Sequence, residues 1–248
     1  MSRRFEELDW QQTDLGAISL RRRLHPTLEI DVHEVKLGDE FLMSSLFPVA
    51  EIELARLGLA ACAADELDVV VGGLGLGYTA VAALEEPRLR SLVVVEALDP
   101  VIAWHERHLL PDAASLVTDP RARLVQGDFF ALARGTTPFG ARSPRRVHAV
   151  LLDIDHTPRH VLHPSHAAFY TPEGLRAMRD HLHPDGVFAL WSDDPPDDDF
   201  VALLEAEFGS AEAQVVSFAN PLTGGTSANT VYVAVGGPTQ LGDPGHPR

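Results

Sequence analysis

The stretch "DVVVGGLGLGYT", residues 68–79, joins a run of valines to a glycine-rich loop. An apolar run of this kind is typical of a strand that is buried on both faces of a parallel sheet. Gly73, Gly75 and Gly77 then give a G-x-G-x-G spacing where the strand would meet a helix. Glycine allows a tight turn and lets the backbone approach a ligand closely. The stretch therefore predicts the first strand of an α/β domain with a ligand site at its carboxyl end.

The rest of the chain repeats this alternation. Further apolar runs occur at 91–96, 122–126, 148–153 and 187–192, and "AQVVSF" and "NTVYVAV" predict a closing antiparallel pair. Strands that alternate with helices indicate a doubly wound, Rossmann-like α/β fold. We predict a mostly parallel seven-stranded sheet with an antiparallel last strand. Helices are expected over 49–59, 79–84 and 100–109, from Thr171 onward, and near 198–207.

The N-terminal part has a different pattern. In "LEIDV" (28–32), Leu28, Ile30 and Val32 alternate with acidic residues, which predicts a strand with one buried face. We expect a small N-terminal β-hairpin or three-stranded sheet within residues 1–47. The Rossmann-like domain would cover 48–236 and a flexible tail 237–248.

Composition narrows the class of protein. The chain has 248 residues, of which 45% are hydrophobic, and a formal net charge of −16. The hydrophobic content is enough for a sizeable core, and the charge argues against a nucleic-acid partner. Cys62 is the single cysteine, so one chain has neither a disulfide nor a cysteine-based zinc site. The sequence shows no signal peptide or membrane-spanning run, so we expect no membrane association and a cytoplasmic protein.

Acidic residues follow the second and third strands. Glu96 ends the second strand, where its carboxylate could accept both ribose hydroxyls of a ligand. Asp128 follows the third strand and could accept a hydrogen bond from an adenine amino group, with Phe129 beside the ring. Both acids could instead be helix N-caps. Together with the glycine loop they indicate an adenosine-containing ligand. NAD stays an alternative, although its usual G-x-x-G spacing is missing.

The stretch "DIDHTPRHVLHPSH" follows the fourth strand. It places Asp153 and Asp155 before His156, and three more histidines follow, His160, His163 and His166. Prolines interrupt the run, so no helix presents the histidines to one metal ion, and we predict no metal site. We interpret His163 and His166 as residues that cap, hydrogen-bond or face water. We predict that His156 is a general base or substrate-binding group, with Asp153 or Asp155 as its partner.

A second acidic loop, "WSDDPPDDDF" (191–200), follows the fifth strand. Its carboxylates could attract a polyamine or another cationic acceptor. For Asp197, Asp198 and Asp199 we favour the alternative of a helix start, because acidic residues stabilise helix N-termini.

These motifs resemble those of the spermidine synthase family, within the class I methyltransferase-like fold. The similar segments extend from about residue 66 to 236 and include "VGGLGLGYTAVAAL", "VVVEALDPVIAWHERHLL", "TDPRARLVQGDFF" and "LLDIDHTP". The resemblance implies a transferase that uses decarboxylated S-adenosylmethionine, or S-adenosylmethionine itself, as co-substrate. It implies transfer of an aminopropyl group to the amine of a polyamine, and a homodimer formed with the help of the N-terminal β-domain.

Three positions differ from the family. Leu76 stands where the family has an aspartate that faces the donor's amine, and His156 stands at the second acidic place of its D-x-x-D motif. "EFLMSSLFPVAE" (40–51) has no clear counterpart of its Tyr-His-Glu segment. A methyltransferase and a non-catalytic nucleoside-binding protein therefore remain alternatives, and the acceptor is unidentified. The lost carboxylates also predict an acceptor that is less cationic than a free diamine.

Overall fold

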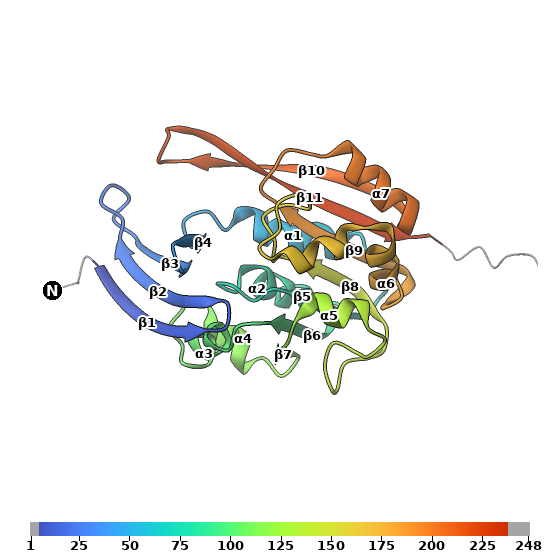
Figure 1. The fold of residues 1–248 in the computed structure, drawn as a ribbon, viewed down its shortest axis with the longest axis horizontal. Coiled ribbons are helices and arrows are strands. Elements are labelled where there is room, and N and C mark those ends of the chain that lie inside the picture. Colours follow the sequence, from blue (N-terminus) through green and yellow to red (C-terminus); the bar gives the residue numbers. More distant parts are fainter. Residues whose placement is uncertain (1–4, 238–248) are drawn as a thin grey trace, which may run out of the picture.

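The protein folds into two sheets, shown in a computed structural model that describes residues 5–237 (Figure 1). The N-terminal sheet is antiparallel and has the order β1-β2-β3-β4. Its strands are β1 (Phe5–Thr13), β2 (Gly16–Leu24), β3 (Asp31–Leu37) and β4 (Glu40–Ser44). The second, larger sheet follows it in the chain and contains the glycine-loop strand.

The main sheet has seven strands in the order β10-β11-β9-β8-β5-β6-β7. β5 to β9 pair in parallel, and β11 runs antiparallel to both β9 and β10. The predicted doubly wound α/β fold is therefore confirmed. The strands are β5 (Leu67–Gly72), β6 (Leu89–Glu96), β7 (Ala122–Gln126), β8 (Val147–Leu152), β9 (Leu182–Ser192), β10 (Gly209–Asn220) and β11 (Gly225–Gly236).

Helices cover both faces of this sheet and enclose two cores. Successive side chains of β5 point to opposite faces, so Val69 and Val71 pack with α1 and α2, whereas Val70 packs with α5, α6 and α7. The helices are α1 (Val49–Ala60), α2 (Tyr78–Leu84), α3 (Asp99–Glu106), α4 (Ala113–Thr118), α5 (Phe129–Arg134), α6 (Pro172–Arg179) and α7 (Asp198–Phe208), with the 3-10 helix η1 (Pro164–Tyr170).

The N-terminal sheet differs from its prediction. It has four strands, and the strand expected over 28–32 is wrong for its first part, because β3 begins only at Asp31. Ile30 is 47% exposed, and Glu29 has a left-handed φ of 55° within a turn closed by hydrogen bonds to His25. The sequence pattern did not predict β1, because its apolar side chains Phe5 and Trp10 do not form a buried face. Each of them is 55% exposed.

The N-terminal sheet packs against the carboxyl ends of the parallel strands, on the left in Figure 1. The buried indole Nε1 of Trp104 in α3 donates a hydrogen bond to Asp9 Oδ2 at 2.7 Å, and Arg107 lies 3.5 Å from the same carboxylate. Ile18 and Leu20 share the core that contains α1 and α2. The sheet is thereby attached to the edge where a ligand site is expected.

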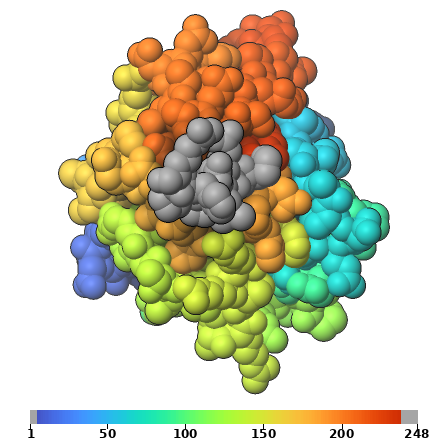
Figure 2. Space-filling model, turned by 90° about the vertical axis from the view of Figure 1, so that its right-hand side faces the viewer, coloured from blue at the N-terminus to red at the C-terminus, as the bar shows by residue number. Residues whose placement is uncertain are grey.

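The opposite face, seen in Figure 2, shows α7 and β10 at the top and the segment between α5 and β8 at the bottom. Residues 238–248 of the predicted tail lie outside the described residues. Within residues 5–237, no helix has the length and apolar character needed to span a membrane.

Candidate active site at the carboxyl edge of the sheet

The glycine loop between β5 and α2 has a backbone that side chains would disrupt. Gly73, Gly75 and Gly77 have φ values of 94°, 48° and 94°. A Cβ on Gly73 would lie 2.1 Å from the backbone oxygen of Asp153, and one on Gly75 would lie 3.0 Å from Met43 Sδ. Glycine is therefore required here by both conformation and close packing. At Gly73 that packing is against the protein's own chain.

His105 in α3 supports this loop and was missed by the sequence analysis. Its Nε2 lies 3.0 Å from the backbone oxygen of Gly75, to which it donates when it carries the proton. A Cβ on Gly77 would lie 2.7 Å from His105 Cε1. The side chain is 1% exposed, and burial lowers its pKa, so the ring is neutral near pH 7. The only sequence signal was a histidine on the apolar face of a helix.

Glu96 connects the glycine loop to the turn that leads into α3. One carboxylate oxygen accepts the Leu74 N–H at 3.0 Å, and the other accepts the Leu98 N–H at 2.9 Å. Burial raises the pKa of Glu96, and the backbone hydrogen bonds oppose that shift. Leu98, not Glu96, is the N-cap residue of α3. The backbone N–H groups of Leu74, Gly75, Ala97 and Leu98 surround the carboxylate, and its contact with a ribose stays a prediction.

Asp128 and Phe129 have local roles. Asp128 is the N-cap of α5, where its Oδ1 accepts the Ala131 N–H at 3.0 Å, so the helix-cap alternative is realised for this oxygen. The prediction that the Phe129 ring lies beside an adenine is wrong. Phe129 is 2% exposed and stacks on Phe139 with 5.5 Å between ring centroids. It is a core residue, because the first helical turn directs its side chain under the sheet.

Asp155 holds the loop after β8 and does not orient His156. Its Oδ1 accepts the Leu162 N–H at 2.7 Å and faces His166 Nδ1 at 2.8 Å, and its Oδ2 accepts the Tyr170 hydroxyl at 2.8 Å. The carboxylate is 1% exposed. The predicted catalytic role of Asp155 is therefore corrected to a structural one, because all its contacts are within its own loop and η1.

His156 has a different carboxylate partner from the one expected. Its Nε2 lies 3.3 Å from Glu40 Oε1, which belongs to β4 of the N-terminal sheet. The sequence could not show this pair, since the two residues are 116 positions apart. His156 lines a small cavity beside the glycine loop, and its backbone oxygen accepts the Asp193 N–H at 2.8 Å.

The four histidines of this loop do not converge. His163 caps η1 by accepting the Ser165 N–H at 3.3 Å, and His166 is hydrogen-bonded to Asp155, both as expected. The His166 ring also stacks on Phe130 at 4.0 Å between centroids. His156 and His160 have ring centroids 5.2 Å apart. In the described part of the chain, no three His, Cys, Asp or Glu side chains are arranged to hold a metal ion.

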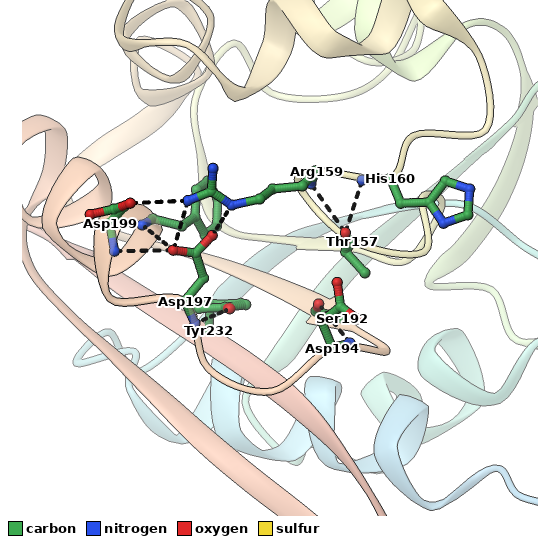
Figure 3. A network of polar contacts seen from close by, with 9 residues as sticks. Thr157, Arg159, His160, Ser192, Asp194, Asp197, Asp199 and Tyr232 are labelled. Carbon is green, nitrogen blue, oxygen red and sulfur yellow. Dashed lines mark hydrogen bonds and ion pairs between the residues drawn. The ribbon is translucent and has the colours of Figure 1, made fainter.

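Arg159 joins the same loop to the acidic segment before α7 (Figure 3). Its guanidinium donates to both carboxylate oxygens of Asp197 and, at 3.2 Å, to Asp199. Asp197 also accepts the Asp199 and Phe200 N–H groups as the N-cap of α7, and Arg159 lowers its pKa. The expected helix start is therefore confirmed at Asp197, and these carboxylates are engaged by an arginine.

Two carboxyl groups lie together beneath the glycine loop. Asp153 follows β8, and Glu51 belongs to the first turn of α1. Thr79 Oγ1 lies 2.7 Å from Asp153 Oδ2 and 3.2 Å from the backbone oxygen of Glu51, so it bridges the two elements. Burial and the Asp153 charge raise the pKa of Glu51 to about 8, and burial raises that of Asp153 to about 6. Near pH 7 the pair therefore holds one proton and one negative charge.

The sequence analysis missed Glu51. It is the acidic residue that ends the segment "EFLMSSLFPVAE", for which no clear counterpart of the family's Tyr-His-Glu was found. Its position in the first turn of a helix is also where an acidic residue favours helix formation, so the pattern alone gave no reason to choose it.

Glu51, Asp153 and His156 line one cavity of about 100 Å³. Gly75 and Leu76 of the glycine loop line it as well. The indole Nε1 of Trp191, another lining residue, is buried and has no hydrogen-bond partner among the described residues. A second, more open cavity of about 540 Å³ lies beside Asp128. The smaller cavity is therefore lined by residues of β4, of α1, of the glycine loop after β5, of the loop after β8 and of β9. These segments meet at the carboxyl edge of the main sheet.

Comparison with known proteins gave a match in structure and none in sequence. No protein-family model and no curated protein matches the sequence. The spermidine synthase from Thermotoga maritima matches the structure with a TM-score of 0.69 at 17% identity, over 95% of this chain and 74% of that chain. The chain has a spermidine synthase-like fold.

Two further spermidine synthase structures agree with this result. One, in complex with the transition state analogue AdoDATO, matches with a TM-score of 0.69 at 18% identity, over 95% of this chain and 74% of that chain. A probable spermidine synthase from Corynebacterium glutamicum ATCC 13032 matches with a TM-score of 0.61 at 16% identity, over 93% of this chain and 79% of that chain. At these identities the likeness shows the fold alone.

Asp155→Asn should destabilise this spermidine synthase-like fold. An amide in place of the carboxylate leaves at least one of three buried donors without an acceptor, at about 1–3 kcal/mol for each. We expect the free energy of unfolding, measured in urea, to fall by about 2–4 kcal/mol. Asp199→Asn is the control, because that side chain is 92% exposed. Equal stability of the two variants would contradict the anchoring role of Asp155.

Glu51→Gln should change how stability depends on pH. Between pH 4.5, the ordinary pKa of Glu51, and about 8, the folded protein keeps a proton that the unfolded chain has lost. The free energy of unfolding of the parent therefore has its full value below this pH window and falls as the pH rises through it. The variant should exceed the parent by roughly 1–3 kcal/mol in free energy of unfolding at pH 8, and by little at pH 4.5.

Urea unfolding at both pH values measures this difference. Glu53→Gln, two residues along the same helix, is the matched control, since Glu53 pairs with Arg56 at the surface. A Glu51→Gln protein whose pH profile parallels that of the parent would show that Glu51 does not hold a proton in the folded state.

Proposed function

We propose that this protein is a spermidine synthase-like transferase. It binds S-adenosylmethionine or its decarboxylated form and transfers an aminopropyl-type alkyl group to a small-molecule amine. The observation that carries this proposal is the carboxyl pair Glu51–Asp153, which lies beside the glycine loop in a cavity also lined by His156. A transfer of this kind needs a donor site and a proton acceptor next to each other, and this edge of the sheet offers both.

The donor would lie across the ends of β5, β6 and β7. Gly75, with its left-handed φ of 48°, would shape the loop beside the donor, Glu96 would accept the ribose hydroxyls, and the second oxygen of Asp128 would accept from the adenine amino group. Methylthioadenosine or S-adenosylhomocysteine would leave the same site. The proposed nucleoside site depends mainly on Glu96. Its two carboxylate oxygens already accept one backbone N–H of the glycine loop and one of the turn before α3.

The chemistry requires few protein groups. The amine nitrogen attacks the carbon next to the sulfonium, the C–S bond breaks with its electron pair left on sulfur, and the nitrogen loses a proton. The Glu51–Asp153 pair, which carries one negative charge near pH 7, is able to accept that proton, and His156 is the second candidate. The remaining contribution of the protein is to position both substrates.

Leu76 favours a methyltransferase as the second candidate function. It is 8% exposed and lines the cavity with an aliphatic side chain, so the donor's amine meets no carboxylate at this position. S-adenosylmethionine would then be the donor and a methyl group would be transferred. A nucleoside-binding protein without catalysis is the third alternative.

Assays with both donors and a panel of amines separate these functions. Methylthioadenosine as product means aminopropyl-type transfer, S-adenosylhomocysteine means methyl transfer, and neither product means a binding protein. We expect His156→Ala to lower kcat by about 10²-fold or more if His156 acts as a base. Its affinity for methylthioadenosine should stay within about threefold, because His156 does not lie at the proposed nucleoside site. His163→Ala, in the same loop, is the control, and equal kcat in both variants would exclude His156 as the base.

Glu96→Gln should weaken nucleoside binding. Hydrogen bonds to a charged acceptor contribute about 1.5–3 kcal/mol, which corresponds to a loss of roughly 10–100-fold in affinity for methylthioadenosine. Calorimetry measures it, with circular dichroism to verify folding. Glu85→Gln, at the exposed end of α2, is the control. A folded Glu96→Gln protein with the affinity of the parent would move the nucleoside site elsewhere.

We also propose a cytoplasmic homodimer that uses the N-terminal sheet. The exposed aromatic side chains Phe5, Trp10 and Phe41 on this sheet support the homodimer, since exposed apolar groups favour association.

A further inference from the structure

Thr79 is a buried residue that contacts both members of the carboxyl pair. It lies in the first turn of α2, directly after the glycine loop, and is 2% exposed. Its Oγ1 lies 2.7 Å from Asp153 Oδ2 and 3.2 Å from the backbone oxygen of Glu51. Three segments of the chain, α1, α2 and the end of β8, therefore meet at one hydroxyl group.

The hydroxyl of Thr79 has one hydrogen and reaches two acceptors. A carboxylate accepts a stronger hydrogen bond than a backbone oxygen, so the hydrogen points to Oδ2 while Asp153 is ionised. The Glu51 backbone oxygen is a second acceptor for the same hydrogen when Asp153 is protonated. Both protonation states of Asp153 therefore leave the buried hydroxyl paired, without a change in the backbone.

The two carboxylate oxygens of Asp153 are not equivalent. Oδ2 accepts from Thr79, whereas Oδ1 has no hydrogen-bond partner among residues 5–237 and is not sealed inside the protein. Asp153 lines the cavity beside the glycine loop. Oδ1 is therefore the oxygen that is open to a ligand in this cavity.

The carboxyl group of Glu51 has no comparable donor. Thr79 contacts its backbone oxygen and not its side chain. Burial and the charges of Asp153 and Asp193 raise the pKa of Glu51 to about 8. Burial raises the pKa of Asp153 to about 6, and the hydrogen bond from Thr79 opposes that shift. These directions agree with the hydrogen bonds, since Thr79 stabilises a negative charge on Asp153.

Other titratable groups face the pair from neighbouring elements. Tyr78 and His156 line the same cavity, and the charge of Asp193 acts on Glu51. Burial raises the pKa of Tyr78, so its hydroxyl is neutral near pH 7. The Nε2 atom of His156 contacts the N-terminal sheet instead of the pair. Among residues 5–237, Thr79 is the side chain that donates a hydrogen bond to a carboxyl group of the pair.

We propose that Thr79 is a positioning residue for the transfer: its hydroxyl holds Asp153 as the ionised member of the pair, with Oδ1 free, and so selects Asp153 over Glu51 as the proton acceptor. This inference rests on the proposed function and deepens it. Thr79 acts through Asp153 and does not line the cavity itself.

The proton transfer balances with this arrangement. The neutral amine nitrogen forms the new N–C bond, and the C–S bond breaks with its electron pair left on sulfur. The nitrogen is then positively charged and gives one proton to Asp153 Oδ1, which leaves both carboxyl groups of the pair protonated. Oδ2 thereby becomes a weaker acceptor, and the Thr79 hydrogen turns to the Glu51 backbone oxygen.

Thr79→Val and Thr79→Ser test the inference as a matched pair. Valine has nearly the shape of threonine without the hydroxyl, whereas serine keeps the hydroxyl. In assays that measure methylthioadenosine, we expect the acidic limb of the pH profile of kcat to rise by about one pH unit in Thr79→Val, because ionised Asp153 loses its donor. In Thr79→Ser the limb should stay within about 0.3 unit of the parent. An acidic limb that is unchanged in Thr79→Val would overturn the inference and leave the proposed function intact.

Nuclear magnetic resonance gives a readout that does not require turnover. In protein labelled at the aspartate carboxyl carbons, the signal that is missing from Asp153→Asn identifies Asp153, and its titration midpoint is followed with pH. We expect this midpoint to be about one unit higher in Thr79→Val than in the parent and in Thr79→Ser. Equal midpoints in all three proteins would overturn the inference.

The two measurements separate the inference from the proposed function. If no amine yields methylthioadenosine, the proposed function fails, and the titration of Asp153 still decides whether Thr79 holds it ionised. Circular dichroism verifies that each variant is folded. If Thr79→Val does not fold, Thr79→Ala takes its place in the same titration, with the same expected shift, and a midpoint equal to that of the parent again overturns the inference.

Discussion

The close contact between the glycine loop and the end of β8 is the constraint on which the site depends. The Asp153 N–H donates to the backbone oxygen of Gly72 at 2.8 Å, and the Asp153 carbonyl occupies the space where a side chain on residue 73 would lie. The parallel pairing of β5 and β8 is thereby extended past the strands. This contact holds Asp153 beside Thr79 at the start of α2. No residue with a Cβ at position 73 would allow it, whatever ligand the loop binds.

Burial of the carboxyl groups of Asp153 and Glu51 costs free energy and changes how readily they lose their protons. Asp153 and Glu51 lie close enough for their charges to interact, and both lose water, so one proton stays on the pair near neutral pH. A carboxyl pair of this kind contributes nothing to stability at high pH. It is the kind of group that the proposed transfer needs as a proton acceptor. The two cores, which cover both faces of the sheet, supply the stability that the site lacks.

The N-terminal sheet completes the cavity from a distant part of the sequence. Leu42 and Met43 form part of its wall, and Glu40 contacts His156. The hydrogen bond from Trp104 to Asp9 attaches this sheet to α3, the helix whose His105 supports the glycine loop. The lining of the cavity therefore comes from both sheets, because the main sheet provides the carboxyl group of Asp153 and the N-terminal sheet provides apolar surface.

The sequence by itself determined the main sheet and the position of the site. Valine-rich runs that end in glycine or acidic residues predict buried parallel strands with polar groups at their carboxyl ends, and the glycines at 73, 75 and 77 predict the loop. What each polar side chain contacts was decided by the tertiary structure. Asp155 and Phe129 satisfy local packing, Glu51 and Glu40 arrive from other elements, and His105 lies beneath the loop. A motif records which residues are near one another along the chain, whereas hydrogen bonds and pKa shifts depend on neighbours in space that are up to 116 positions away.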